Sequence, residues 1–248
     1  VGNHFTNTAS IMAYGYNPYI AKWSPYHGAA YAVVDACAKV VAAGARYDNM
    51  RFSYQEYFER MTDAKSWGKP LASLLGALKM QVELGLPSIG GKDSMSGTFR
   101  DINVPPMLMA FGITTVDARN VISPEFKEGG HNIYVVRHTP TENYMPATDQ
   151  LKDNFDFVAD KILSGDIVAG YAVGFGGVAE AVAKMSFGNK IGAALECDEQ
   201  MLYNLSYGSI VVESRRTLNH PSAELIGKTV KEEAIFVNGT RLPLDELL

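Results

Sequence analysis

Cysteine is scarce in this chain of 248 residues, which contains two, Cys37 and Cys197. Neither belongs to a C-x-x-C pair, so a metal–thiolate site and a cysteine nucleophile are poorly supported. Cys37 lies in an apolar segment and reads as a buried, free thiol. Free thiols are typical of a reducing compartment, and we therefore expect a cytoplasmic protein.

The chain also lacks an excess of positive charge and a long apolar run. The net charge is −5 and the isoelectric point about 5.6, which excludes a basic nucleic-acid footprint and requires any phosphate site to be local. The longest apolar stretch, residues 29–44, is interrupted by Asp35 and Lys39. It is shorter than the roughly 20 residues that span a bilayer. Residues 1–10 are polar and lack the basic start of a signal peptide, so no membrane partner is expected.

The remaining composition is that of a globular α/β protein, with 47% hydrophobic and 20% charged residues. Charges, Pro124 and a Gly-Gly pair mark a composition shift at residues 117–130. We therefore predict two domains of similar size, residues 1–120 and 121–248. The chain begins without methionine and in mid-pattern, which suggests a fragment or an excised domain, with the first domain truncated at its start.

Hydrophobic periodicity predicts the secondary structure of both halves. Strands are expected at residues 9–13, 107–116, 132–137, 192–195 and 209–213, and helices at 28–45, 55–61, 70–84, 149–164 and 178–187. Residues 14–27 are expected to form an aromatic-rich loop, and 167–171 either a strand or the end of a helix. Asn238-Gly239 predicts a type I′ hairpin turn.

Residues 89–98 (IGGKDSMSGT) gather small and polar groups directly after an apolar segment. The glycines Gly90 and Gly91 allow close approach of the backbone, while Lys92, Asp93 and the hydroxyls of Ser94 and Ser96 offer polar contacts. Amides, a lysine and hydroxyls suit an oxyanion such as phosphate. The stretch matches neither G-x-x-x-x-G-K-[ST] nor G-x-G-x-x-G, so a simple glycine-rich turn remains the alternative.

This loop occurs together with three other strings: residues 24–30 (SPYHGAA), 105–108 (PPML) and 174–180 (GFGGVAE). Together they resemble phosphoribosylformylglycinamidine synthase, also called formylglycinamide ribonucleotide amidotransferase, over essentially the whole chain. The GKDSMS string is typical of the second of the two synthetase halves of that family. The resemblance implies an aminoimidazole ribonucleotide synthetase-like fold, α/β (α+β), with an N-terminal and a C-terminal domain.

The resemblance also implies an activity and partners. In the family, ATP phosphorylates an amide oxygen, and ammonia from glutamine displaces the phosphate to form formylglycinamidine ribonucleotide in purine biosynthesis. The cofactors implied are ATP or ADP with Mg²⁺. The partners implied are the first synthetase half and the glutaminase domain, with pairing through the N-terminal domain and possible homodimers when this chain is isolated. The site residues implied are Gly90, Gly91, Lys92, Asp93, Ser94, Ser96, Gly176 and Gly177 for nucleotide and Asp35 for metal.

The chain departs from the family at several of these positions. The glutaminase triad is absent, so this chain cannot release ammonia from glutamine. Asp35 and Lys39 stand where the family has a Glu and an Asn that bind magnesium, and an ammonium has no lone pair for a metal. Ala172 and Phe175 replace carboxylates in the C-terminal motif. We therefore expect a degenerate nucleotide site without catalytic residues, in which the Lys39 ammonium replaces a magnesium ion beside Asp35 and Asp93.

Two interpretations remain for individual residues and for the whole chain. Lys92 is a phosphate ligand or a solvated lysine, Asp93 a metal ligand or a turn cap, and the two serines ligands or caps. The aromatic residues of the segment 14–26 favour an interface over a base-stacking platform. The chain itself is expected to be a ligase half that is structural or binds an auxiliary nucleotide. The alternative is a stand-alone nucleotide-binding or kinase-like protein of the same superfamily.

Overall fold

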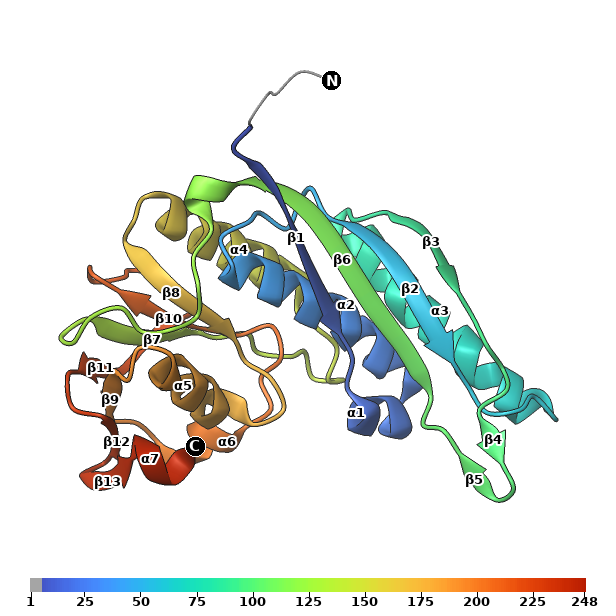
Figure 1. The fold of residues 1–248 in the computed structure, drawn as a ribbon. Helices are drawn as coiled ribbons and strands as arrows, with labels where there is room; N and C mark the ends of the chain where they lie inside the picture. The colour runs from blue at the N-terminus through green and yellow to red at the C-terminus, as the bar shows by residue number, and fades with distance from the viewer. Residues whose placement is uncertain (1–5) are drawn as a thin grey trace.

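Two large β-sheets, each packed on helices, and a small two-stranded sheet make up the structure (Figure 1). It is a computed structural model that describes residues 6–248, so the first residues of the polar N-terminus and of the predicted first domain lie outside it. The last strand of the first sheet ends at Asp117 and the first strand of the second sheet begins at Asn132, so the change of sheet coincides with the composition shift at residues 117–130. Whether residues 1–120 and 121–248 are separate domains stays a prediction. No helix within the described range is long and apolar enough to cross a membrane.

The first sheet has the strand order β1-β6-β2-β3. Its strands are β1 (Thr8–Gly15), β6 (Met107–Asp117), β2 (Arg51–Tyr57) and β3 (Ser88–Lys92), and only β2 and β3 are parallel. Helices α2 (Pro25–Ala42) and α3 (Ala64–Leu84) cover one face (Figure 1). The smaller elements are α1 (Pro18–Trp23), β4 (Thr98–Phe99) and β5 (Ile102–Asn103).

The helix predicted at residues 55–61 is wrong, and so is part of the predicted loop at 14–27. Residues 51–57 alternate between exposed and buried, as expected for a strand with one covered face, and form β2. In the loop segment, Asn17 caps a short helix by accepting hydrogen bonds from the backbone N–H groups of Tyr19 and Ile20. The predicted helices at 28–45 and 70–84 are confirmed as α2 and α3.

The second sheet has the order β13-β12-β9-β11-β7-β10-β8. Its strands are β7 (Asn132–Val136), β8 (Ile167–Ala172), β9 (Gly192–Leu195), β10 (Ile210–Ser214), β11 (Ala223–Val230), β12 (Ala234–Val237) and β13 (Thr240–Pro243). Its helices are α4 (Thr148–Leu163), α5 (Gly177–Phe187), α6 (Glu199–Tyr203) and α7 (Leu244–Leu247), and the 3₁₀ turn η1 (Ala118–Asn120) precedes it. Asn238 and Gly239 have φ values of 48° and 88°, which confirms the type I′ turn between β12 and β13.

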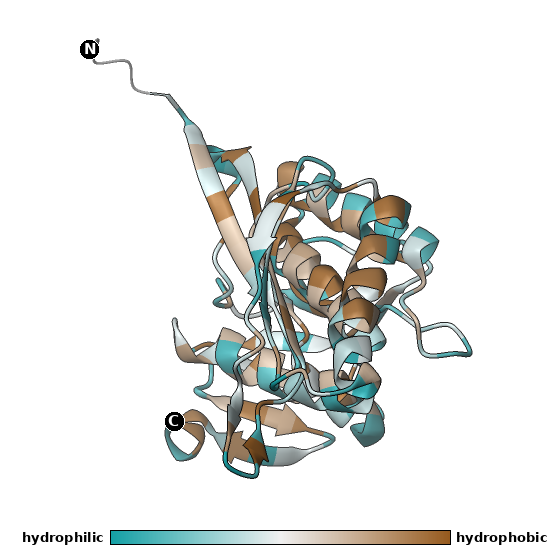
Figure 2. Ribbon diagram, turned by 90° about the vertical axis from the view of Figure 1, so that its right-hand side faces the viewer, coloured by the Kyte–Doolittle hydropathy of each residue, from teal (hydrophilic) through white to brown (hydrophobic). Residues whose placement is uncertain are grey.

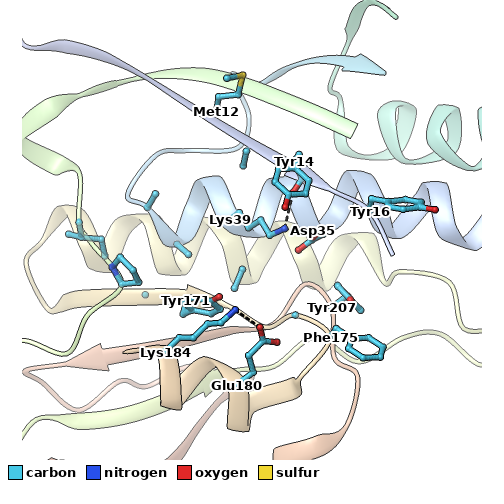
Figure 3. Close-up of a pocket in the computed structure, with 18 residues that line it drawn as sticks. Met12, Tyr14, Tyr16, Asp35, Lys39, Tyr171, Phe175, Glu180, Lys184 and Tyr207 are labelled. Atoms are coloured by element: carbon cyan, nitrogen blue, oxygen red, sulfur yellow. Dashed lines mark hydrogen bonds and ion pairs between the residues drawn. The ribbon is translucent and has the colours of Figure 1, made fainter. Parts of the chain in front are cut away.

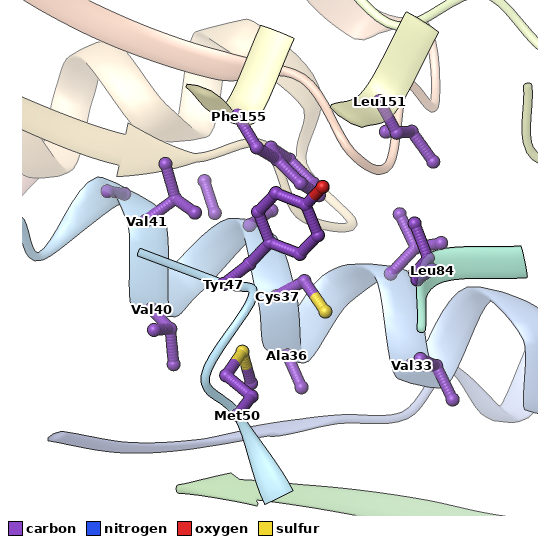
Figure 4. Close-up of a cluster of buried hydrophobic side chains, with 14 of the residues drawn as sticks. Val33, Ala36, Cys37, Val40, Val41, Tyr47, Met50, Leu84, Leu151 and Phe155 are labelled. Atoms are coloured by element: carbon purple, nitrogen blue, oxygen red, sulfur yellow. The ribbon is translucent and has the colours of Figure 1, made fainter. Parts of the chain in front are cut away.

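Helix α2 packs against both halves of the structure and lies at the centre of their common apolar core. Ser24 caps it, Pro25 occupies its first turn, and most of its side chains are buried. In Figure 4, Cys37 and Val41 face Tyr47 and the α4 residue Phe155. The same apolar cluster includes residues of β2, α3 and β10, so it extends from one sheet to the other.

A buried carboxylate ties the segment between the sheets to β10. Glu213 is fully buried. Its two oxygens accept hydrogen bonds from the backbone N–H groups of Lys127, at 2.7 Å, and Glu128, at 3.2 Å. His131 Nδ1 lies 2.6 Å from Oε1. Three groups of one connecting segment thus depend on this single side chain.

Candidate functional site

A cleft of about 610 Å³ lies between the two halves (Figure 3). One wall comes from β1 and α2, and the other from β8, α5 and the turn before α5. Its polar and aromatic lining residues are Tyr14, Tyr16, Asp35, Lys39, Tyr171, Phe175, Glu180, Lys184 and Tyr207. The volume is that of a typical small-molecule site.

The α2 wall carries an ion pair between Asp35 and Lys39. Lys39 Nζ lies 2.8 Å from Asp35 Oδ2, donates a second bond of 2.8 Å to the carbonyl oxygen of Tyr14, and sits 4.8 Å from the centre of the Tyr14 ring. Asp35 is 4% exposed, and its Oδ1 has no hydrogen-bond partner among the described residues. Burial raises the pKa of Asp35 to about 6, and the Lys39 ammonium offsets only part of that rise.

The opposite wall carries a second ion pair, on the first turns of α5. Glu180 Oε1 lies 2.5 Å from Lys184 Nζ, and Oε2 accepts a hydrogen bond of 2.7 Å from the backbone N–H of Gly176. Partial burial would raise the pKa of Glu180, but the bonds from Lys184 and Gly176 lower it below its usual range. Figure 3 shows the two pairs facing each other across the cleft.

The glycines at the start of α5 are required by close packing. Gly177 has a φ of +68°, and a Cβ there would lie 2.4 Å from the carbonyl oxygen of Leu202. A Cβ on Gly176 would lie 2.5 Å from the Cβ atom of Glu180. Because Glu180 already accepts from the Gly176 amide, a carboxylate of the chain occupies one of the donors that an incoming phosphate would use at this helix end.

The sequence-predicted site residues fall in two separate places. Asp35 lies in the cleft, and Gly176 and Gly177 lie at its edge, beside Phe175. The loop Gly90, Gly91, Lys92, Asp93, Ser94 and Ser96 lies on and after β3, at the far edge of the first sheet from β1. The expectation that Lys39 lies beside both Asp35 and Asp93 is therefore wrong for Asp93. Periodicity in the sequence could not show at which edge of the sheet this loop lies.

Backbone contacts hold that second loop against β2. A Cβ on Gly91 would lie 2.6 Å from the carbonyl oxygen of Tyr54, which explains the glycine. The backbone N–H of Ser94 donates to the carbonyl of Glu56, and the hydroxyls of Ser94 and Ser96 lie 2.9 Å apart. Lys92 Nζ donates to the carbonyl of Asp93 at 3.2 Å. The polar groups of the loop therefore face solvent at a sheet edge, outside the cleft.

The donor set of the cleft does not fit Mg²⁺. Within residues 6–248, no three His, Cys, Asp or Glu side chains are grouped so that they could hold a metal ion. Asp35 shares one oxygen with a lysine, and Lys39 and Lys184 would repel a divalent cation. Magnesium prefers several oxygen ligands in octahedral geometry. The residues present are better suited to an anion than to a metal.

The sequence alone did not point to Glu180, Lys184, Tyr171 or Tyr207 as site residues. Glu180 and Lys184 are four residues apart on one face of α5, just after the glycine turn. That four-residue spacing was the sequence signal that could have identified Glu180 and Lys184 as site residues. Tyr171 and Tyr207 come from a strand and a distant loop, and only the fold brings them to the cleft.

Comparisons with known proteins place the chain in context. No protein-family model matches it. It is 26% identical over 265 residues to the PurL subunit of phosphoribosylformylglycinamidine synthase from Methanocaldococcus jannaschii, an alignment that covers 92% of this chain. Over most of its length the chain is similar to phosphoribosylformylglycinamidine synthase. It spans 35% of the length of that PurL subunit.

Solved structures confirm the predicted fold. Thermotoga maritima PurL complexed with FGAR superimposes with a TM-score of 0.78 and 14% identity, covering 98% of this chain and 46% of PurL. Thiamine monophosphate kinase from Aquifex aeolicus matches with a TM-score of 0.64 and 12% identity, over 95% of this chain and 88% of the kinase. The chain therefore has the aminoimidazole ribonucleotide synthetase-like fold shared by PurL and the kinase. At these identities the likeness shows fold alone.

Proposed function

We propose that this chain is one half, the second, of a phosphoribosylformylglycinamidine synthase, and that it binds an auxiliary nucleotide without performing chemistry. The relationship to PurL and the cleft between the two sheets support the proposal. In such an enzyme the phosphoryl transfer and the amination occur elsewhere. The ammonia comes from a glutaminase domain, and the isolated chain is inactive.

The observation that carries this proposal is the pairing of lysines with carboxylates on both walls of the cleft. Lys39 and Lys184 provide two ammonium groups that face a nucleotide-sized space, and the aromatic rings of Tyr14, Tyr171 and Tyr207 line it. A phosphate would draw both ammoniums away from their carboxylates. Asp35, whose pKa is raised to about 6, can accept a proton when its partner is drawn away. The site therefore favours metal-independent and weak binding of ADP or ATP.

Calorimetric titration with ADP tests this function. We expect the dissociation constant to change by less than about threefold when EDTA replaces Mg²⁺, because the ligands are ammoniums. Lys184→Met should weaken binding about tenfold, the loss of one charge-assisted contact. Lys190→Met is the matched control, because Lys190 pairs with Glu233 outside the cleft. Binding that requires Mg²⁺ and is abolished by Asp35→Ala would contradict the proposal, as would the absence of binding at millimolar ADP.

The open face of the first sheet supports pairing with the other synthetase half. Met12 and Ile113 are cross-strand partners on that face, and they are 70% and 42% exposed. Tyr14 is exposed beside them. An apolar sheet face of this kind suits a second sheet packed against it. The same contact would leave the loop of Lys92 and Asp93 near the partner rather than near the cleft of its own chain.

A stand-alone nucleotide-binding protein is the second candidate. It is favoured by the match to 88% of thiamine monophosphate kinase, a chain of similar extent. The two candidates differ in phosphoryl transfer. The first predicts no ADP release from ATP by the isolated chain with small phosphate acceptors, whereas steady turnover would favour the second. The free thiols of Cys37 and Cys197 accord with the cytoplasmic setting expected for either.

A further inference from the structure

Helix α3 presents most of its large apolar side chains to solvent, whereas its covered face carries mainly small residues together with Met80 and Leu84. The face toward α2 carries Ser73, Gly76 and Ala77, and a Cβ on Gly76 would lie 2.0 Å from the carbonyl oxygen of Tyr26. The outward face carries Trp67, Leu71, Leu74, Leu75, Leu78 and Val82, each between 46% and 72% exposed. We call these six side chains the α3 stripe. Figure 2, which looks onto this side of the molecule, shows hydrophobic turns of helix facing the viewer.

This stripe is larger than isolated exposed residues on a monomer surface. Its members follow the three- and four-residue spacing of a helix–helix seam over more than three turns. The helix is capped at both ends, by the Asp63–Ser66 capping box and by Gly85 in the left-handed conformation, so the stripe belongs to a stable helix. A contiguous apolar surface of this length indicates an interaction site.

The order of residues along the stripe is self-complementary. In an antiparallel pair of α3 helices with a two-fold axis between positions 74 and 75, Trp67 meets Val82, Leu71 meets Leu78, and Leu74 meets Leu75 of the other copy. Every exposed apolar side chain then faces another, as an isologous two-fold interface requires. The antiparallel direction also aligns the helix dipoles favourably.

We propose that the α3 stripe is a homodimer interface in which two copies of this chain pair through antiparallel α3 helices. The close approach of α3 to α2 leaves the stripe standing outward, so the pairing needs no rearrangement of the monomer. Burying the stripe removes on the order of 600 Å² per protomer from water, close to the 800 Å² of a standard stable interface. This surface lies on the helix side of the first sheet, away from the open sheet face.

Disulfide trapping tests the geometry. In a Cys197→Ser background, where Cys37 is buried, Leu74→Cys places two thiols next to the proposed axis. Val82→Cys is the matched control on the same stripe, because antiparallel pairing holds the two copies of that position roughly 20 Å apart. We expect Leu74→Cys to form a covalent dimer under mild oxidation and Val82→Cys to remain monomeric. Equal crosslinking of both, or of neither, overturns the proposal.

Light scattering at about 100 µM supplies an independent readout. The wild-type chain should be dimeric, and Leu78→Glu should raise the dissociation constant at least a hundredfold, as expected for a charge in the centre of an interface. Lys65→Glu, an exposed position of α3 outside the stripe, should leave the dimer intact. Circular dichroism checks that each variant is folded. A monomeric wild type overturns the proposal. So does a dimer that persists in Leu78→Glu but dissociates in Ile113→Glu, since that result assigns it to the open sheet face.

Discussion

Glu213→Ala is expected to lower the free energy of unfolding by about 3 kcal/mol, as measured by urea denaturation at pH 7. The carboxylate is fully buried and accepts from two backbone N–H groups while contacting His131. Removing it leaves the amides of Lys127 and Glu128 without acceptors, and unsatisfied buried donors are among the largest sources of destabilisation. The change also detaches the segment that connects the two sheets.

Glu224→Ala provides the matched control for this experiment. Glu224 pairs with Arg137 at 2.6 Å on the protein surface, with half of its side chain exposed. Exposed ion pairs contribute little, so a change of less than about 0.5 kcal/mol is expected. If the two variants lost the same stability, the buried network around Glu213 would have no special structural role.

Lys39→Met is expected to lower the free energy of unfolding by about 2 kcal/mol at pH 8 and by much less at pH 5. At pH 8 Asp35 is charged and 4% exposed, and the variant removes the ammonium of Lys39 that is bonded to it. The expected loss of stability is smaller than for a fully buried pair because the lysine side chain is 37% exposed. At pH 5 the carboxyl is largely protonated and no longer depends on a cation.

The direction of this pH dependence follows from the pKa of Asp35. Burial raises that pKa to about 6 in the folded protein, above its usual value, so the folded state holds the proton more tightly than the unfolded state. The stability that this carboxyl contributes is therefore present below the unfolded pKa and is lost as the pH rises through about 6. Without Lys39 the folded pKa rises further, and the loss at pH 8 grows.

Asp35→Asn supplies the corresponding double-variant cycle. In that background the change Lys39→Met should cost little at either pH, because no buried charge remains to be compensated. Equal destabilisation by Lys39→Met in both backgrounds would show that the packing of the lysine stem, and not its charge, stabilises this wall of the cleft.

Much of the fold was predictable from local pattern, because the long helices and central strands carry strong periodicity. The strand β2 was not, since its segment RFSYQEY contains more polar than apolar residues and only its pairing with β6 and β3 decides its state. The strand β11 was missed for a similar reason: Gly227 and a register shift interrupt its alternation.

The candidate site was only half predictable. Asp35 and the glycines before α5 were found because each lies in a motif with local meaning. The groups that surround the Asp35–Lys39 pair, including Tyr14 and Glu180, lie on other elements of the chain. The leucines of α3 show the opposite failure. The helical spacing of Leu71, Leu74, Leu75 and Leu78 is compatible with a core face, yet the structure exposes them and buries the opposite face, which carries small residues together with Met80 and Leu84.

Helix α2, embedded between the two sheets, has a further consequence for ligand binding. Its residues pack at once on β1, α3 and α4, so the cleft wall that holds Asp35 and Lys39 cannot swing without disrupting apolar contacts in both halves. A ligand therefore enters a preorganised site and loses little affinity to closure. Heat capacity changes on binding should then reflect only the surface of the cleft itself, with no contribution from hinge motion between the sheets.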